Sequence, residues 1–122
     1  MKRVLDVGNC DPDHSSISAM ITGNFDAEIV RAHGHADAIE SLRNGSFDLV
    51  MVNRTMDHDG SSGLEIIQAI KSNEATQHTP VVMITNFEEH QQAAMAAGAN
   101  RGFGKTSLAT DETLDTLRPF LG

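Results

Sequence analysis

The chain has 122 residues, a formal net charge of -8, one cysteine and no tryptophan or tyrosine. This length supplies one hydrophobic core, so we expect a single domain over residues 1–122. Phosphate contacts need clustered basic side chains, and the 9 lysine and arginine residues are scattered, which argues against a nucleic-acid partner. No apolar run is long enough for a signal peptide or membrane span, so we expect a cytoplasmic protein without a membrane partner.

Short aliphatic runs alternate with stretches whose apolar residues recur every three or four positions, which is typical of repeated βα units. The predicted strands are residues 4–7, 27–32, 48–52, 81–85 and 100–103. The predicted helices follow them, and their apolar positions are Ile17, Met20 and Ile21; Ala36, Ile39 and Leu42; Leu64, Ile67 and Ile70; Ala93, Ala94 and Ala97; and Leu108, Leu114, Leu117 and Leu121. Residues 49–52 and 81–84 are apolar throughout, which predicts two central strands of a parallel sheet covered on both faces.

In open parallel sheets the functional site forms outside the carboxyl ends of the strands. Four loops of this chain reach that edge, and each carries polar side chains. They contain Asn9, Cys10 and Asp11 after the first strand, Asn53 to Thr55 after the third, Thr85 and Asn86 after the fourth, and Lys105 and Thr106 after the fifth. We therefore expect these side chains to share one site.

The chain from Lys2 to Leu121 resembles the receiver domain of bacterial two-component response regulators. The resemblance is carried by the sequences FDLVMVN at 47–53, VMIT at 82–85, AAGA at 96–99 and FGK at 103–105. It implies a flavodoxin-like (βα)5 fold, a doubly wound parallel sheet with strand order 2-1-3-4-5 and helices on both faces. It also implies a signalling module without enzymatic activity.

In that family an acidic pair after the first strand holds a magnesium ion, and an aspartate ending the third strand accepts a phosphoryl group from a histidine kinase. A threonine or serine and a lysine then contact the phosphoryl oxygens. By resemblance, Thr85 and Lys105 take these two contact positions and Phe103 takes the position of the switching aromatic residue. Asn53 stands at the acceptor position, and a carboxamide cannot form an acyl phosphate.

The acidic positions also differ from the family pattern. Asn9, Cys10 and Asp11 precede Pro12, so only Asp11 offers a carboxylate. Magnesium prefers oxygen ligands in near-octahedral geometry, so we expect no resident cofactor and at most weak Mg2+ binding at Asp11. Thr106 replaces the proline that usually follows the lysine, and the loop 57–63 is about two residues longer than usual.

We weigh three functions. The first is an atypical receiver that signals by protein–protein interaction, presenting the face of the fourth helix, fifth strand and fifth helix to a histidine kinase or a downstream output protein. Homodimerisation through the fourth-helix face is compatible with it. The second keeps phosphorylation, with Asp11 or Asp57 as the acceptor. The third is a flavodoxin-like binder of a small ligand, which the absence of a glycine-rich phosphate loop and of stacking aromatics disfavours.

Several pocket residues also have structural interpretations. Lys105 would neutralise Asp11 or meet the Asn53 carbonyl, because buried lysines need a partner. Thr85 would cap the fourth helix. Asp6 lies in an apolar strand and needs a partner that the sequence does not identify. Cys10 is interpreted as a space-filling residue rather than a redox sensor, and His33, His35 and His58 as solvated loop residues.

Overall fold

Five parallel strands form one sheet in the order β2-β1-β3-β4-β5. The strands are β1 (Lys2–Val7), β2 (Ala27–Ala32), β3 (Leu49–Asn53), β4 (Val81–Ile84) and β5 (Asn100–Phe103). This computed structural model describes all 122 residues. It confirms the predicted fold class and strand order, and the predicted strands agree with it to within two residues at each end.

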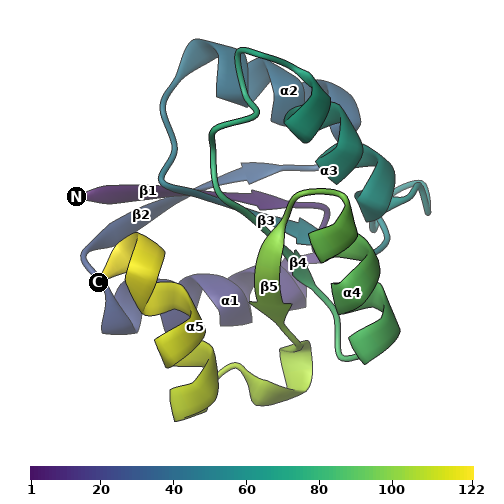
Figure 1. Cartoon of the computed structure of the whole chain (residues 1–122). Helices are drawn as coiled ribbons and strands as arrows, with labels where there is room; N and C mark the ends of the chain where they lie inside the picture. Colours follow the sequence, from purple (N-terminus) through teal and green to yellow (C-terminus); the bar gives the residue numbers. More distant parts are fainter.

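Five α-helices cover both faces of the sheet. They are α1 (Asp11–Asn24), α2 (His35–Asn44), α3 (Gly63–Ser72), α4 (Glu88–Ala96) and α5 (Asp111–Leu121), with a short 3-10 turn η1 (Lys105–Ser107) before α5. Helices α2, α3 and α4 lie on one face, and α1 and α5 on the other (Figure 1). None of these helices combines the length and the apolar character needed to cross a membrane.

The two central strands alternate their side chains between two hydrophobic cores. The core under α2, α3 and α4 takes Val50, Val52, Val81 and Met83. The core under α1 and α5 takes Leu49, Met51, Val82 and Ile84. Every one of these side chains is buried. An uninterrupted apolar sequence is therefore the expected pattern for strands that are covered on both faces.

The buried residues of helix α2 differ in part from those predicted. Its buried residues are Ala38 and Leu42, whereas Ala36 is exposed. Ala36 and Ala38 are two residues apart, so they point about 200° apart around a helix and cannot both face the sheet. The short side chain of alanine gave no basis for choosing between them.

The central-strand assignment predicts a large loss of stability on truncation. Val50→Ala or Ile84→Ala is expected to lower the free energy of unfolding by about 2–4 kcal/mol, because each leaves a cavity in a packed interior. Urea unfolding measures the loss. Phe87→Ala is the control, since that ring is 54% exposed and its removal should change stability by about 0.5 kcal/mol or less. Equal losses in all three variants would contradict the assignment.

Candidate functional site

A cavity of about 230 Å³ opens at the carboxyl edge of β3 and β4. We call it the Asn53 cavity, and its lining residues are Asn53, Arg54, Thr55, Ile84, Thr85, Asn86, Phe87 and Lys105. The structure thus brings Asn53, Thr85 and Lys105 together, although they lie at or just after the ends of three different strands. Phe103 lies outside this lining, buried in the core beneath α1 and α5.

The side chain of Asn53 is held by backbone carbonyl groups. Its Nδ2 donates to the Thr55 carbonyl at 2.7 Å and to the Gly8 carbonyl at 3.2 Å. Gly8 adopts a φ of +82°, and a Cβ there would lie 2.4 Å from the Met56 sulfur, so the position requires glycine. An ionised aspartate has no proton to donate to these carbonyls, so the surrounding backbone suits an amide.

Lys105 pairs with Asp13, not with the expected Asp11 or Asn53 carbonyl. The Lys105 Nζ lies 2.7 Å from Asp13 Oδ2, whereas Asp11 pairs with Arg31 at 2.8 Å and its side chain is 88% exposed. Asp11 and Asp13 both lie in the first turn of α1 and point about 200° apart, so only one of them can face β5. Asp13 therefore supplies the carboxylate that pairs with the lysine of the cavity.

The electrostatics of Asp13 follow from this contact. The hydrogen bond from Lys105 is the main cause that lowers the pKa of Asp13 below its usual value of 3.8, against burial, which raises it. A hydrogen bond from Cys10 lowers the pKa of Asp13 further. Cys10, the residue before α1, is partly buried and carries a free thiol. Its place beside Asp13 could not be seen in the sequence.

Asp6 has the partners that the sequence did not identify. This carboxylate is fully buried in β1. It accepts a hydrogen bond from Asn9 Nδ2 at 2.6 Å, and His14 Nδ1 lies 2.5 Å from its other oxygen. His14 comes from the first turn of α1, so the pair joins that helix to the sheet. A histidine eight residues after a strand aspartate was the available signal, and the sequence analysis missed it.

Arg31 of β2 completes this cluster from the neighbouring strand. Its Nη2 donates to the Asn9 carbonyl at 2.9 Å and also pairs with Asp11. Two buried atoms, Arg31 Nε and Asn9 Oδ1, have no hydrogen-bond partner. Asn9 donates its side-chain Nδ2 to Asp6 and accepts from Arg31 through its backbone carbonyl. Asn9 does not line the Asn53 cavity.

Thr85 does not serve as the N-cap of α4, which is Phe87. The Thr85 hydroxyl instead accepts from the Phe87 backbone N–H at 3.3 Å and lies 3.5 Å from His90 Nδ1. Gln91 fixes α4 to the sheet, because its amide donates to the Met83 carbonyl and accepts from the Gly102 N–H. The sequence analysis missed this role of Gln91.

The loop after β3 is an ordered turn. Gly60 has a positive φ of +71°. Gly63 has no positive φ, but a Cβ there would lie 2.0 Å from the Asn53 carbonyl oxygen, so the close approach of the backbone requires glycine. His58 contacts the His33 carbonyl at 3.2 Å. His33, His35 and His58 are all exposed.

The residues at this edge fit a magnesium ion poorly. Asp11 is held by Arg31, Asp13 by Lys105, and Asp6 is buried beneath His14. No group of three or more His, Cys, Asp or Glu side chains is placed to hold a metal ion. Mg2+ demands near-octahedral oxygen coordination, and these carboxylates do not offer it because each already has a partner.

Comparisons with known proteins agree on one family. The family model described as response regulator receiver domain matches residues 11–117. The chemotaxis protein CheY-3 of Vibrio cholerae is 34% identical over 84 residues, which cover 66% of this chain and 63% of CheY-3. The match therefore spans less than two thirds of that relative's length.

Solved structures share the fold over nearly the whole chain. The signal receiver domain of a DNA-binding response regulator from Colwellia psychrerythraea is 25% identical with a TM-score of 0.77, covering 98% of this chain and 99% of that one. The response regulator TrrA of Thermotoga maritima, in complex with Mg(2+)-BeF, is 23% identical with a TM-score of 0.76, covering 99% and 100%.

The buried Asp6–His14 pair predicts a strongly non-additive pair of mutations. His14→Ala is expected to lower the free energy of unfolding by about 3 kcal/mol, because it leaves a buried carboxylate without one of its two hydrogen-bond partners. Asp6→Val combined with His14→Ala should recover part of that loss, since the unpaired carboxylate is gone, although Asn9 Nδ2 then lacks its acceptor. Urea unfolding of the single and double variants measures the coupling; additive losses would show that the pair does not interact energetically.

The Lys105–Asp13 pair predicts a pH-dependent contribution to stability. The pKa of Asp13 is lowered in the folded state, so the pair stabilises the fold above about pH 4 and the effect is lost as pH falls through the lowered value. Asp13→Asn should therefore destabilise at pH 7 by at most about 1 kcal/mol, because solvent screens this partly exposed pair, and the loss should shrink as the pH falls below about 4. Asp57→Asn, exposed and unpaired, is the control. An Asp13→Asn effect that persists unchanged at pH 2 would exclude the ion pair as its cause.

Proposed function

The chain belongs to the response regulator receiver family, and we propose that it is an atypical member that signals through protein–protein contact without phosphorylation of an aspartate. Two-component signalling by receiver domains is the shared role of the family. The proposal concerns how this member differs. It treats residues 1–122 as one receiver-like domain that acts in the cytoplasm as a signalling module and not as an enzyme.

The observation that carries the proposal is the position of Asn53. It ends β3 and lines the same cavity as Thr85 and Lys105, which supports its assignment to the acceptor position. Its amide nitrogen donates to two carbonyl groups. An amide is not a nucleophile toward phosphorus at neutral pH, and the acceptor must lie in line with the incoming phosphoryl group.

The alternative acceptors receive no support from the geometry. Asp11 is paired with Arg31, and Asp57 is exposed in the loop after β3. Neither residue lines the Asn53 cavity. A phosphoryl group on either one would lie outside the cavity that Lys105 and Thr85 share. We also propose that Mg2+ binds only weakly, because the carboxylates nearest to the cavity are already paired.

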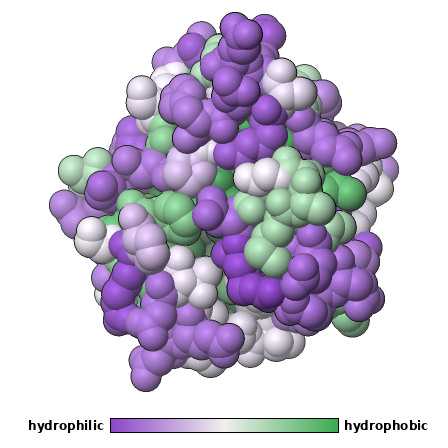
Figure 2. All heavy atoms as spheres, in the orientation of Figure 1, coloured by the Kyte–Doolittle hydropathy of each residue, from purple (hydrophilic) through white to green (hydrophobic).

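We propose that the partner, a histidine kinase or an output protein, docks on the face of α4, β5 and α5. A second cavity of about 230 Å³ opens on this face, and its lining includes Phe87, Arg101 and Glu112. Arg101 of β5 binds Glu88 of α4 through two hydrogen bonds of 2.7 Å, and this contact lowers the pKa of Glu88 to about 2. Over α4 the surface carries a pale green, weakly apolar area beside hydrophilic groups (Figure 2), which would also suit a second copy of this chain.

Intact mass after incubation with acetyl phosphate and Mg2+ tests the proposal. The unmodified chain is expected to gain no phosphoryl group, because Asn53 cannot accept one. The Asn53→Asp variant is the matched comparison. A gain in that variant alone would assign the loss of phosphorylation to this one residue; a gain in neither would show that the poor metal site contributes as well.

The opposite result is equally clear. A single phosphoryl gain on the unmodified chain, mapped by peptide mass to Asp11, Asp57 or another carboxylate, would overturn the proposal. Phosphorylation at pocket carboxylates would then be restored as the mode of signalling.

A further inference from the structure

The Asn53 cavity carries a charge opposite to that of the whole protein. The chain has a formal net charge of -8. Among the eight residues that line the cavity, however, Arg54 and Lys105 are cationic and none is acidic. The cavity is therefore a local cationic region on an acidic molecule. The electrostatic field of such a region attracts anions.

The cations of the cavity retain free hydrogen-bond donors. The arginine side chains that form ion pairs are Arg3, Arg31, Arg101 and Arg118. Arg54 has no such partner; it is exposed and contributes to the lining of the Asn53 cavity and of a neighbouring cavity beside α3 and α4. Lys105 uses one of its three N–H donors on Asp13. Asn86 accepts from Thr106 through its oxygen, which leaves its NH2 group free to donate.

The neutral side chain of Asn53 is essential to this arrangement. An ionised aspartate at the end of β3 would place a negative charge among these donors and would repel a free anion. The amide removes that charge and keeps the shape of the cavity. Lys105 then has its charge balanced by Asp13 alone, outside the lining, and Arg54 remains unbalanced. A planar guanidinium with five donors is well suited to binding an oxyanion.

We propose that the Asn53 cavity binds a small phosphate-class oxyanion, free inorganic phosphate or a phosphomonoester, reversibly and with no covalent bond to the protein. This inference rests on the proposed function, because it needs residue 53 to stay unphosphorylated. The donors are Arg54, Lys105, the Thr85 hydroxyl and the Asn86 amide. No metal ion is required, since the cavity lining contributes no negative charge for a metal to neutralise.

A ligand bound in the Asn53 cavity would affect the proposed docking face. Residues 85–87 line the Asn53 cavity on one side and the cavity between α4, β5 and α5 on the other. Asn86 also contacts the turn after β5 through Thr106. An anion that binds Thr85 and Asn86 therefore contacts the segment that separates the two cavities. The ligand would act on the partner face through this shared wall.

Isothermal titration with inorganic phosphate and, separately, with phosphoserine tests the inference. Both titrations are done in EDTA, with sodium chloride adjusted to keep the ionic strength fixed. We expect saturable binding of at least one of them, with a dissociation constant on the order of 1 mM, as a few charge-assisted hydrogen bonds would give. Binding of phosphoserine alone would identify a phosphomonoester as the ligand, and binding of phosphate would identify the free ion.

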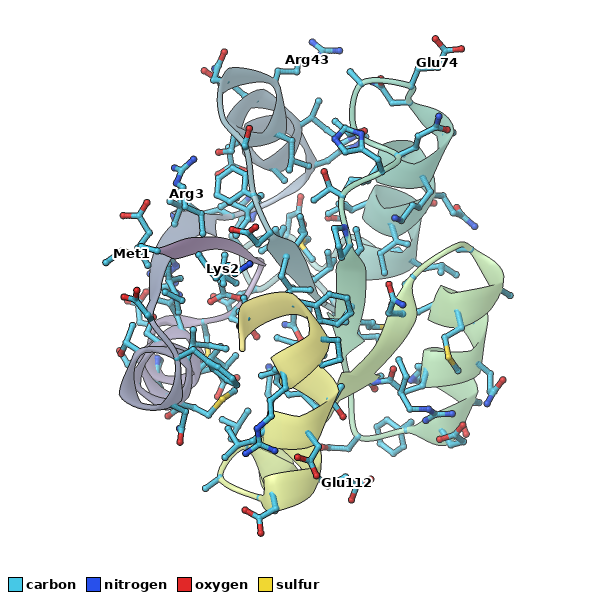
Figure 3. The ribbon with its side chains drawn as sticks, turned by 60° about the vertical axis from the view of Figure 1, so that its left-hand side comes forward. Met1, Lys2, Arg3, Arg43, Glu74 and Glu112 are labelled. Carbon is cyan, nitrogen blue, oxygen red and sulfur yellow. The ribbon has the colours of Figure 1, made fainter.

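Three variants locate the site. Arg54→Gln should weaken binding about tenfold, and Asn53→Asp should weaken it at least as much by adding a negative charge. Arg43→Gln is the matched control, because it removes the same charge from an arginine without an ion-pair partner that points into solvent from α2 (Figure 3). Thermal unfolding of each variant checks that it folds.

Two results would overturn the inference: no saturable binding of either probe, or equal weakening by Arg54→Gln and Arg43→Gln, which would mean that the anion senses only net charge. The experiment is independent of the test of the proposed function. Neither probe can transfer a phosphoryl group in EDTA, so absence of binding would leave that proposal intact. A phosphoryl gain from acetyl phosphate would reject the proposed function in a separate measurement.

Discussion

The burial of both faces of a parallel sheet is the constraint on which the rest of this structure depends. Strands β3 and β4 have no solvent-facing side, so each must send alternate side chains into two cores, and helices must cover both. Parallel strands then end at one common edge. That edge is where the chain turns into its helices, and it is where Asp13 meets Lys105, which lies 92 residues away in sequence.

Charge at this edge is distributed in three separate pairs. Asp6 is satisfied inside the sheet by His14 and Asn9, Asp11 faces outward onto Arg31, and Asp13 holds Lys105. Each carboxylate therefore has its own counter-group, and none is shared across a common metal site. This arrangement explains why the cavity lined by Thr85 and Lys105 contains no acidic side chain.

The neutral side chain at the end of β3 contributes to the cationic lining of the Asn53 cavity. An amide at the end of β3 is compatible with the carbonyl groups of Gly8 and Thr55, and it leaves Arg54 without a negative neighbour in the cavity. The loop at 85–87 is then the structural link between the cavity and the face of α4, β5 and α5. We propose that this segment lets the domain respond to what occupies the cavity without forming a covalent bond.

The sequence by itself determined the fold and part of the lining of the cavity, because Asn9, Cys10 and Asp11 were expected in the same site and do not line it. Uniformly apolar runs at 49–52 and 81–84 require burial on two faces, and the ends of such strands place Asn53, Thr85 and Lys105 together. Only the tertiary structure decided which side chains pair at that edge. Asp11 and Asp13 are two residues apart on α1, so the rotation of this helix against the sheet selects the partner of Lys105. The partners of Asp6 depend on the same rotation, which is set by the packing of Ile17, Met20 and Ile21 and is not encoded in the local pattern of polar residues.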